Sequence, residues 1–151
     1  MRTTDKQRGM TLIELIVAIT LIAILCGMAI PFARNSVQRE KERVLRVDLR
    51  EMRDAIDAYQ QGSLQGLFFK APSAGYPPTL ESLTELIELR NGKKLRLLKE
   101  IPLDPMTGNR EWGVHSMEDD PESDSWNGDQ IFDVYSKSTG TALDGTKYRN
   151  W

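Results

Sequence analysis

The segment Arg8-Gly9-Met10-Thr11-Leu12-Ile13-Glu14-Leu15 precedes an apolar run that extends to Ala33. From Leu15 to Ala33 the chain has no charged residue, and this length is about what a helix needs to cross a hydrocarbon core of roughly 30 Å. We therefore predict that residues 10–33 form a membrane-spanning helix segment or belong to a signal segment.

Glu14 lies at the edge of the apolar run. A carboxylate near the bilayer costs roughly 3 kcal/mol on insertion scales unless another group pairs with it. One interpretation is therefore that Glu14 has a functional partner. The other is that its side chain extends to the level of the lipid headgroups, which a residue at the edge of the run can do. Position alone leaves both interpretations open.

An ordinary secretory signal is the alternative explanation of the apolar run. Gly27-Met28-Ala29 offers small residues for cleavage before Ile30, and the remainder would then be a secreted or membrane-anchored binding domain. The acidic Glu14 directly ahead of the run disfavours this alternative. Lipidation at Cys26 is disfavoured too, because the bulky Leu25 precedes it.

The apolar run continues into a polar helical pattern. Gly27 and Pro31 lie four residues apart. Because proline removes a helical hydrogen bond, we predict a kink or local melting there, which would make the helix flexible in an assembled state, with a static bend as the alternative. Residues 34–61 then have apolar positions three, four and seven apart, which predicts an amphipathic helix that Gly62 ends. Its apolar face comprises Val37, Val44, Leu45, Leu49, Met52, Ile56 and Tyr59.

Residues 62–151 are predicted to contain loops, one short helix and a small sheet. The interval 64–78 is broken by glycine and proline and is predicted to be a loop. Thr79 is a candidate N-cap for a helix that extends to Leu89 and ends at Asn91-Gly92. Residues 111–115 and 130–135 have the pattern of two strands. The predicted fold class is α+β, with a long N-terminal helix packed on a small antiparallel sheet.

Composition limits the function. The length of 151 residues suits one head domain beside the apolar segment. The formal net charge of −2 disfavours nucleic-acid binding. Cys26 is the only cysteine, so no intrachain disulfide can form, and His115 is the only histidine. Neither a Gly-Xaa-Ser-Xaa-Gly motif nor a phosphate-binding loop occurs. We therefore predict that the protein is not an enzyme.

The segment from Arg8 to Glu14 resembles the class III signal of type IV pilins and type II secretion pseudopilins. The resemblance implies that a prepilin peptidase cleaves after Gly9 and that the new amino terminus, Met10, is N-methylated. Met10 stands where the family usually has phenylalanine. The resemblance also implies that Glu14 makes a filament contact, and the Met10 ammonium group of a neighbouring subunit is its plausible partner.

The resemblance divides the chain into a leader (1–9), a transmembrane and filament-core helix segment (10–33) and a pilin-like periplasmic head (34–151). It implies a single-pass inner-membrane protein that assembles with its own copies into a helical filament. The cation count on the two flanks favours the opposite orientation, but the implied cleavage requires a cytoplasmic amino terminus. The other implied partners are prepilin peptidase, further pseudopilins and the inner-membrane assembly platform.

The C-terminal half resembles the major pseudopilin of type II secretion more than a true pilus subunit. Pro102-Leu103-Asp104-Pro105 resembles the turn before its sheet, and the match resumes at residues 132–136. We therefore predict a pseudopilin, a structural filament subunit that drives protein export. A type IV or competence pilin is the alternative.

Calcium is the one ligand that this resemblance raises. The calcium loop of major pseudopilins would map around Leu143-Asp144-Gly145, but residues 146–151 carry no carboxylate side chain, whereas Ca²⁺ needs several oxygen ligands. We therefore expect calcium to be at most a modest stabiliser. A second candidate is the acidic loop with Glu118, Asp119, Asp120, Asp124 and Asp129, although acidic loops are usually only solvated.

Overall fold

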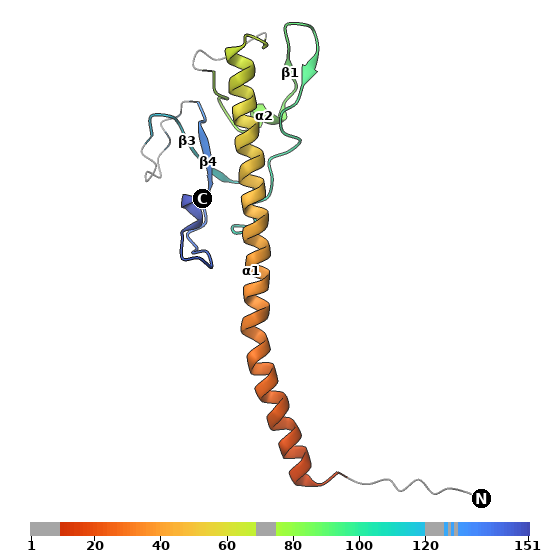
Figure 1. Cartoon of the computed structure of the whole chain (residues 1–151). Coiled ribbons are helices and arrows are strands. Elements are labelled where there is room, and N and C mark those ends of the chain that lie inside the picture. Colours follow the sequence, from red (N-terminus) through yellow and green to blue (C-terminus); the bar gives the residue numbers. More distant parts are fainter. Residues whose placement is uncertain (1–9, 69–74, 120–125, 127, 129) are drawn as a thin grey trace, which may run out of the picture. The chain divides into compact units, whose positions relative to one another are not determined.

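The structure, a computed structural model, describes residues 10–68, 75–119, 126, 128 and 130–151, with the backbone alone for residues 28–33 (Figure 1). The chain divides into two compact units, Met1–Gln38 and Arg39–Trp151. In the described part of the chain, no helix is both long enough and apolar enough to cross a membrane. The leader, including Gly9, and the side chain of Pro31 lie outside the described residues.

The long helix predicted from the sequence is α1, Leu12–Leu64. Thr11 caps its start, because the Glu14 amide donates a hydrogen bond to Thr11 Oγ1 at 3.3 Å. The backbone is helical through Gly27 and residue 31, so the flexibility predicted there stays a prediction. Over Met10–Gly27 nearly every side chain is exposed in the single chain.

The end of α1 differs from the prediction, because Gly66 rather than Gly62 terminates the helix. Gly66 has a φ of +65°, a conformation that glycine adopts without strain. Its amide donates to the carbonyl of Ser63 at 2.9 Å, and the amide of Leu67 donates to the carbonyl of Gly62 at 2.9 Å. These two bonds form a Schellman motif. Gly62 lies within the last turns, where the ring of Phe68 fills the space that a side chain would need.

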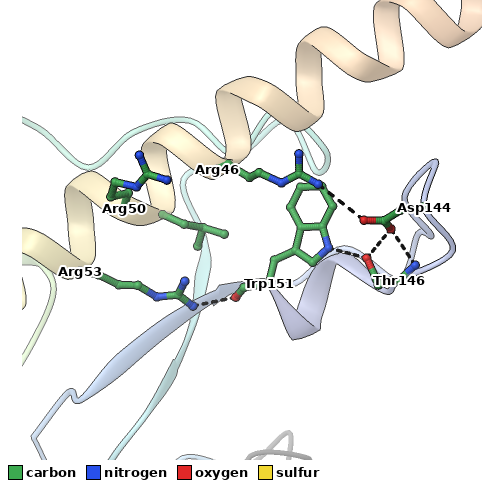
Figure 2. Close-up of a pocket in the computed structure, with 7 residues that line it drawn as sticks. Arg46, Arg50, Arg53, Asp144, Thr146 and Trp151 are labelled. Carbon is green, nitrogen blue, oxygen red and sulfur yellow. Dashed lines mark hydrogen bonds and ion pairs between the residues drawn. The ribbon is translucent and has the colours of Figure 1, made fainter.

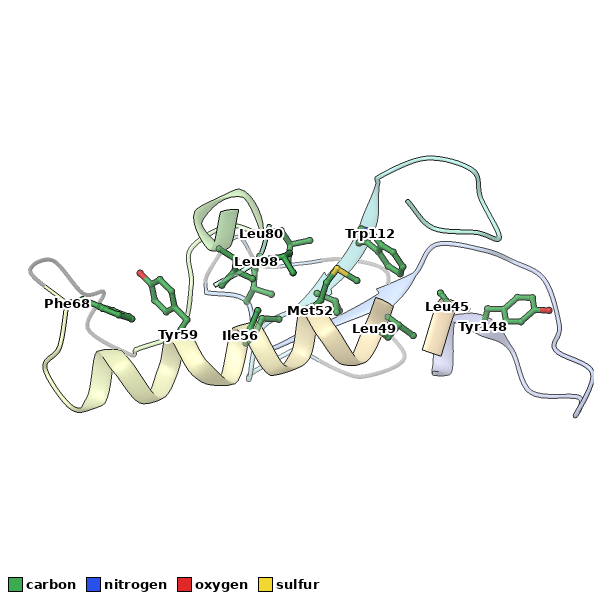
Figure 3. Packing of buried hydrophobic residues seen from close by; sticks show 14 of the residues in the cluster. Leu45, Leu49, Met52, Ile56, Tyr59, Phe68, Leu80, Leu98, Trp112 and Tyr148 are labelled. Atoms are coloured by element: carbon green, nitrogen blue, oxygen red, sulfur yellow. The ribbon is translucent and has the colours of Figure 1, made fainter. Parts of the chain in front are cut away.

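The apolar face of α1 forms the core of the head (Figure 3). Leu45, Met52 and Ile56 are fully buried, and Leu49 and Tyr59 are buried almost completely, as the spacing predicts. Two members of the predicted face differ: Val37 is exposed and Val44 is half-buried. The residues that complete the core come from the rest of the head: Phe68, Leu80, Leu83, Leu98, Trp112, Ile131, Val134, Ala142 and Tyr148.

The prediction of a helix from Thr79 to Leu89 is wrong in the length of the helix. Helix α2 covers only Glu81–Thr84, and the Ser82 amide donates to Thr79 Oγ1 at 3.3 Å near its start. The chain then forms β1 (Ile87–Glu88), which pairs antiparallel with β2 (Lys94–Leu95). Asn91-Gly92 is the turn between these strands, since Gly92 has a φ of +77°, and Asn-Gly is a strong hairpin signal.

The two predicted strands are confirmed, and they pair with each other. β3 (Trp112–His115) lies antiparallel to β4 (Asp133–Ser136), with Gly113 opposite Tyr135. Gly113 is required at its position, because the ring of Tyr135 occupies the place of a Cβ. A 3₁₀ helix, η1 (Tyr148–Asn150), follows near the end of the chain. The predicted α+β class, a long N-terminal helix with small antiparallel sheets, is confirmed.

We expect Ile56→Ala to lower the free energy of unfolding of the head by about 2–5 kcal/mol, because it removes fully buried methyl groups and leaves a cavity. Val47→Ala is the matched control on the same helix, where the side chain is exposed, and it should change stability by less than about 0.5 kcal/mol. Denaturant unfolding of residues 34–151 measures both values. Equal effects of the two substitutions would contradict the assignment of the core.

Candidate functional site

The start of α1 carries the residues that the sequence singled out. Met10, Leu12 and Ile13 are exposed, and Glu14 is exposed in the first turn of the helix. Thr11 and Glu14 have the spacing of a capping box, in which the third helical residue is Glu or Gln. A carboxylate in this first turn also interacts favourably with the helix dipole. Glu14 therefore has a local structural role available to it.

The local role does not satisfy the Glu14 carboxylate. Within the described residues, its side-chain oxygens take part in no hydrogen bond or ion pair, although its amide donates to Thr11 Oγ1. The residues three and four positions further along the helix, Val17 and Ala18, are apolar and offer no polar group. A carboxylate in these surroundings needs a partner from outside the described chain if the helix is buried in lipid or protein.

The loop around Asp144 is closed by hydrogen bonds of its own. Asp144 Oδ1 accepts from the Thr146 hydroxyl at 2.6 Å and from the Thr146 amide at 2.9 Å. Its other oxygen faces Arg46 of α1, with 3.6 Å between Nη2 and Oδ2. The bonds from Thr146, with a smaller contribution from Arg46, hold the pKa of Asp144 below its ordinary value. Both oxygens of this carboxylate therefore already have partners.

Trp151 holds Arg46 in place at this loop. The guanidinium carbon of Arg46 lies 4.0 Å from the centroid of the Trp151 ring, a cation–π arrangement. The indole nitrogen of Trp151 donates to Thr146 Oγ1 at 2.7 Å. Arg46, Asp144, Thr146 and Trp151 thus form one connected group, in which an arginine provides the positive charge next to the carboxylate (Figure 2).

The second candidate calcium loop falls mostly outside the described residues, which exclude Asp120, Asp124 and Asp129. Of the remaining two acids, Glu118 is exposed, and Asp119 Oδ2 accepts from the Ser116 amide at 2.8 Å. In the part of the chain that is described, no three His, Cys, Asp or Glu residues gather as a metal site would require.

Sequence reasoning missed the role of Glu42. Only 6% of this residue is exposed, and its Oε1 accepts from the Leu143 amide at 2.9 Å and from the Tyr148 hydroxyl at 3.0 Å. These bonds join α1 to the segment that contains the Asp144 loop. A signal was present, because Glu42 stands three residues before Leu45, in register with the apolar face.

The turn at Pro102-Leu103-Asp104-Pro105 is anchored to the sheet through Asp104, which is fully buried. Its carboxylate accepts from the Met106 amide at 2.8 Å and from the Ser136 hydroxyl of β4 at 2.6 Å. Burial, together with the charges of Glu51 and Asp104, raises the pKa of Asp48 on α1. The resemblance in this turn thus corresponds to a structural connection, since both Asp104 oxygens are bonded within the head.

Comparison with known proteins assigns the chain to a family. The family model of the prokaryotic N-terminal methylation motif matches residues 4–30. The type II secretion system core protein G of Escherichia coli (strain K12) is 30% identical over 112 residues, which are 70% of this chain and 70% of that protein. The chain belongs to the type II secretion system core protein G family.

Other members of the core protein G family match to a similar extent. The Pseudomonas aeruginosa protein is 27% identical over 66% of this chain and 68% of its own length. The Vibrio cholerae protein is 25% identical over 70% of this chain and 69% of its own length. No solved structure matches. The resemblance to the major pseudopilin of type II secretion is therefore confirmed.

Proposed function

We propose that this chain is a pseudopilin, a structural filament subunit of a type II secretion system that assembles through α1 and has no catalytic role. The observation that carries the proposal is the start of α1. A methylation motif at residues 4–30 coincides there with exposed apolar side chains and with a carboxylate, Glu14, that is unpartnered among the described residues. Names of relatives such as the Escherichia coli core protein G support the same function.

We propose that residues 10–33 occupy two environments, one before and one after filament assembly. Before assembly the segment anchors the chain in the inner membrane with the head in the periplasm, and after assembly it forms the filament core. Both environments are apolar, so the exposed side chains from Leu12 to Leu25 are buried in either one. The proposed partners are further copies of the chain, other pseudopilins, prepilin peptidase and the assembly platform.

We propose that prepilin peptidase cleaves after Gly9, so that the mature protein begins at an N-methylated Met10. Gly9→Val should leave the precursor uncleaved in the membrane, because a pocket shaped for glycine has no room for a branched side chain. N-terminal sequencing and mass spectrometry of the wild-type protein measure the terminus and its methylation. A wild-type terminus at Ile30 would instead identify an ordinary secretory signal.

We propose that Glu14 pairs with the Met10 ammonium group of a neighbouring subunit. Glu14→Ala should insert into the membrane normally but fail to form filaments or support secretion, because an unpaired ammonium group buried in the filament core costs several kcal/mol. Membrane fractionation measures insertion, and the amount of filament sheared from cells measures assembly.

Two variants separate charge pairing from helix capping. Glu14→Gln keeps a side chain that suits the capping box but lacks the charge, so it should fail like Glu14→Ala. Thr11→Ala removes the cap, at a cost of about 1 kcal/mol, but keeps the carboxylate, so it should assemble. The opposite pattern would make Glu14 a capping residue only.

We propose that calcium is at most a modest stabiliser of the head. The Asp144 carboxylate already has partners in Thr146 and Arg46, and a metal ion would have to displace the arginine. The free energy of unfolding of the head should therefore differ between chelator and millimolar calcium by far less than about 2.7 kcal/mol. That value is the stabilisation that a ligand provides at a concentration of 100 times its dissociation constant. Stabilisation of that size by calcium would contradict the proposal. Its loss in Asp144→Ala or in Asp124→Ala would then show which of the two candidate loops binds the ion.

A further inference from the structure

A pocket of about 340 Å³ lies in the head between α1 and the C-terminal segment. Three arginines of α1 line it, Arg46, Arg50 and Arg53, together with Leu49. Asp144, Thr146 and Trp151 form the opposite wall. Figure 2 shows Arg46 and Arg53 extended toward that wall, whereas the Arg50 side chain lies along the helix. The pocket is thus rich in positive charge, with a small apolar surface beside it.

Two of these arginines are already engaged. Arg46 faces Asp144 and stacks on Trp151. Arg53 donates to Asp133 Oδ1 at 2.6 Å and to the main-chain oxygen of Trp151 at 2.6 Å. Arg50 stands between them on the helix, is exposed, and has neither a hydrogen bond nor an ion pair within the described chain. The pocket therefore retains one guanidinium group whose charge is not neutralised.

The chemistry of the pocket suits a single carboxylate. A guanidinium group binds a carboxylate or a phosphate through two parallel hydrogen bonds. Asp144 in the opposite wall would repel a doubly charged phosphate more strongly than a singly charged carboxylate. The Trp151 ring, which is half-buried, can contact the methylene groups that precede a side-chain carboxylate. An aspartate or glutamate of a protein partner therefore fits better than a phosphate group.

A second copy of this chain can supply that carboxylate. A helical filament is built from heterologous contacts, in which two different patches of the same molecule meet. Glu81, Glu85 and Glu88 of the α2–β1 segment are exposed, and none of them has a hydrogen bond or ion pair among the described residues. The pocket adjoins residues 46–53 of α1. The β1–β2 hairpin contacts the chain just after α1, through a hydrogen bond from the Arg90 amide to the Leu67 carbonyl.

We propose that the Arg50 pocket of one subunit binds a glutamate from the α2–β1 segment of the next subunit. This inference rests on the proposed filament function. Complementary charges on two separate patches favour one direction of association and suppress the isologous pairing that would close a dimer. Arg46 and Arg53, on either side of Arg50, are held in place by Asp144, Asp133 and Trp151, so these parts of the pocket are formed before the partner arrives.

Charge exchange in the full chain tests the contact. Arg50→Glu should lower the amount of sheared filament by about tenfold or more, because it places two like charges together. Combining it with Glu81→Arg, Glu85→Arg or Glu88→Arg should restore assembly for one of the three pairs. Lys99→Glu is the control, an exposed cation outside the pocket, and should assemble normally. Unchanged protease resistance of the head in each variant excludes misfolding.

Several results would overturn the inference. One is normal assembly of Arg50→Glu, and another is a loss that none of the three exchanges restores. A third is co-sedimentation of the compact unit Arg39–Trp151, but not of its Arg50→Glu variant, with vesicles of anionic phospholipid. Together with no rescue by exchange, this result would assign the pocket to a lipid headgroup.

Cysteine cross-linking separates this inference from the filament function on which it rests. In a Cys26→Ser background, copies with Arg50→Cys and copies with Glu81→Cys, Glu85→Cys or Glu88→Cys are produced together in membranes and oxidised. A disulfide dimer that needs both partners is the expected result for one pair. Filaments without any such dimer would refute the contact alone, whereas a parent chain that never forms filaments would refute the proposed function.

Discussion

The buried face of α1 between Leu45 and Tyr59 is the constraint on which the head depends. Helix α2, β3, β4 and η1 each contribute at least one side chain to the core that this face forms, and these short elements have little else to bury their apolar residues against. A strand of two to four residues is not stable alone. The head therefore folds around one helix, and substitutions along its buried face affect every element together.

Polar side chains then fix how the loops are placed on that core. Glu42 binds the segment before η1, Arg53 binds β4 and Trp151, and Asp104 binds the turn to Ser136. Each link joins residues far apart in sequence, and each leaves a polar group unsatisfied if one partner is removed, which costs about 1–3 kcal/mol. The same links position the arginines of the pocket beside the C-terminal segment.

Several elements could be predicted because their signals are local. The spacing of apolar residues in 34–61 predicted the core face of α1, and alternation predicted β3 and β4. The extent of α2 and the end of α1 could not be predicted as well. Leu86 and Ile87 continue a helical pattern, but the hairpin at Asn91-Gly92 places Ile87 in a strand and leaves Leu86 exposed. Gly62 precedes Gly66 in sequence, and only the hydrogen bonds of the last turn distinguish them.

The sequence by itself determined the family resemblance, the position of the apolar segment and the candidate residues Gly9, Met10 and Glu14, because these depend on a contiguous motif. It also indicated that the Asp144 loop is poor in acidic ligands. Only the tertiary structure decided that Arg46 and Trp151 meet at that loop, and that Arg50 is the unpartnered cation of a pocket in the described head. The reason is physical, because these contacts join residues about one hundred positions apart. A local sequence pattern does not indicate which long side chains lie close together once the core has packed.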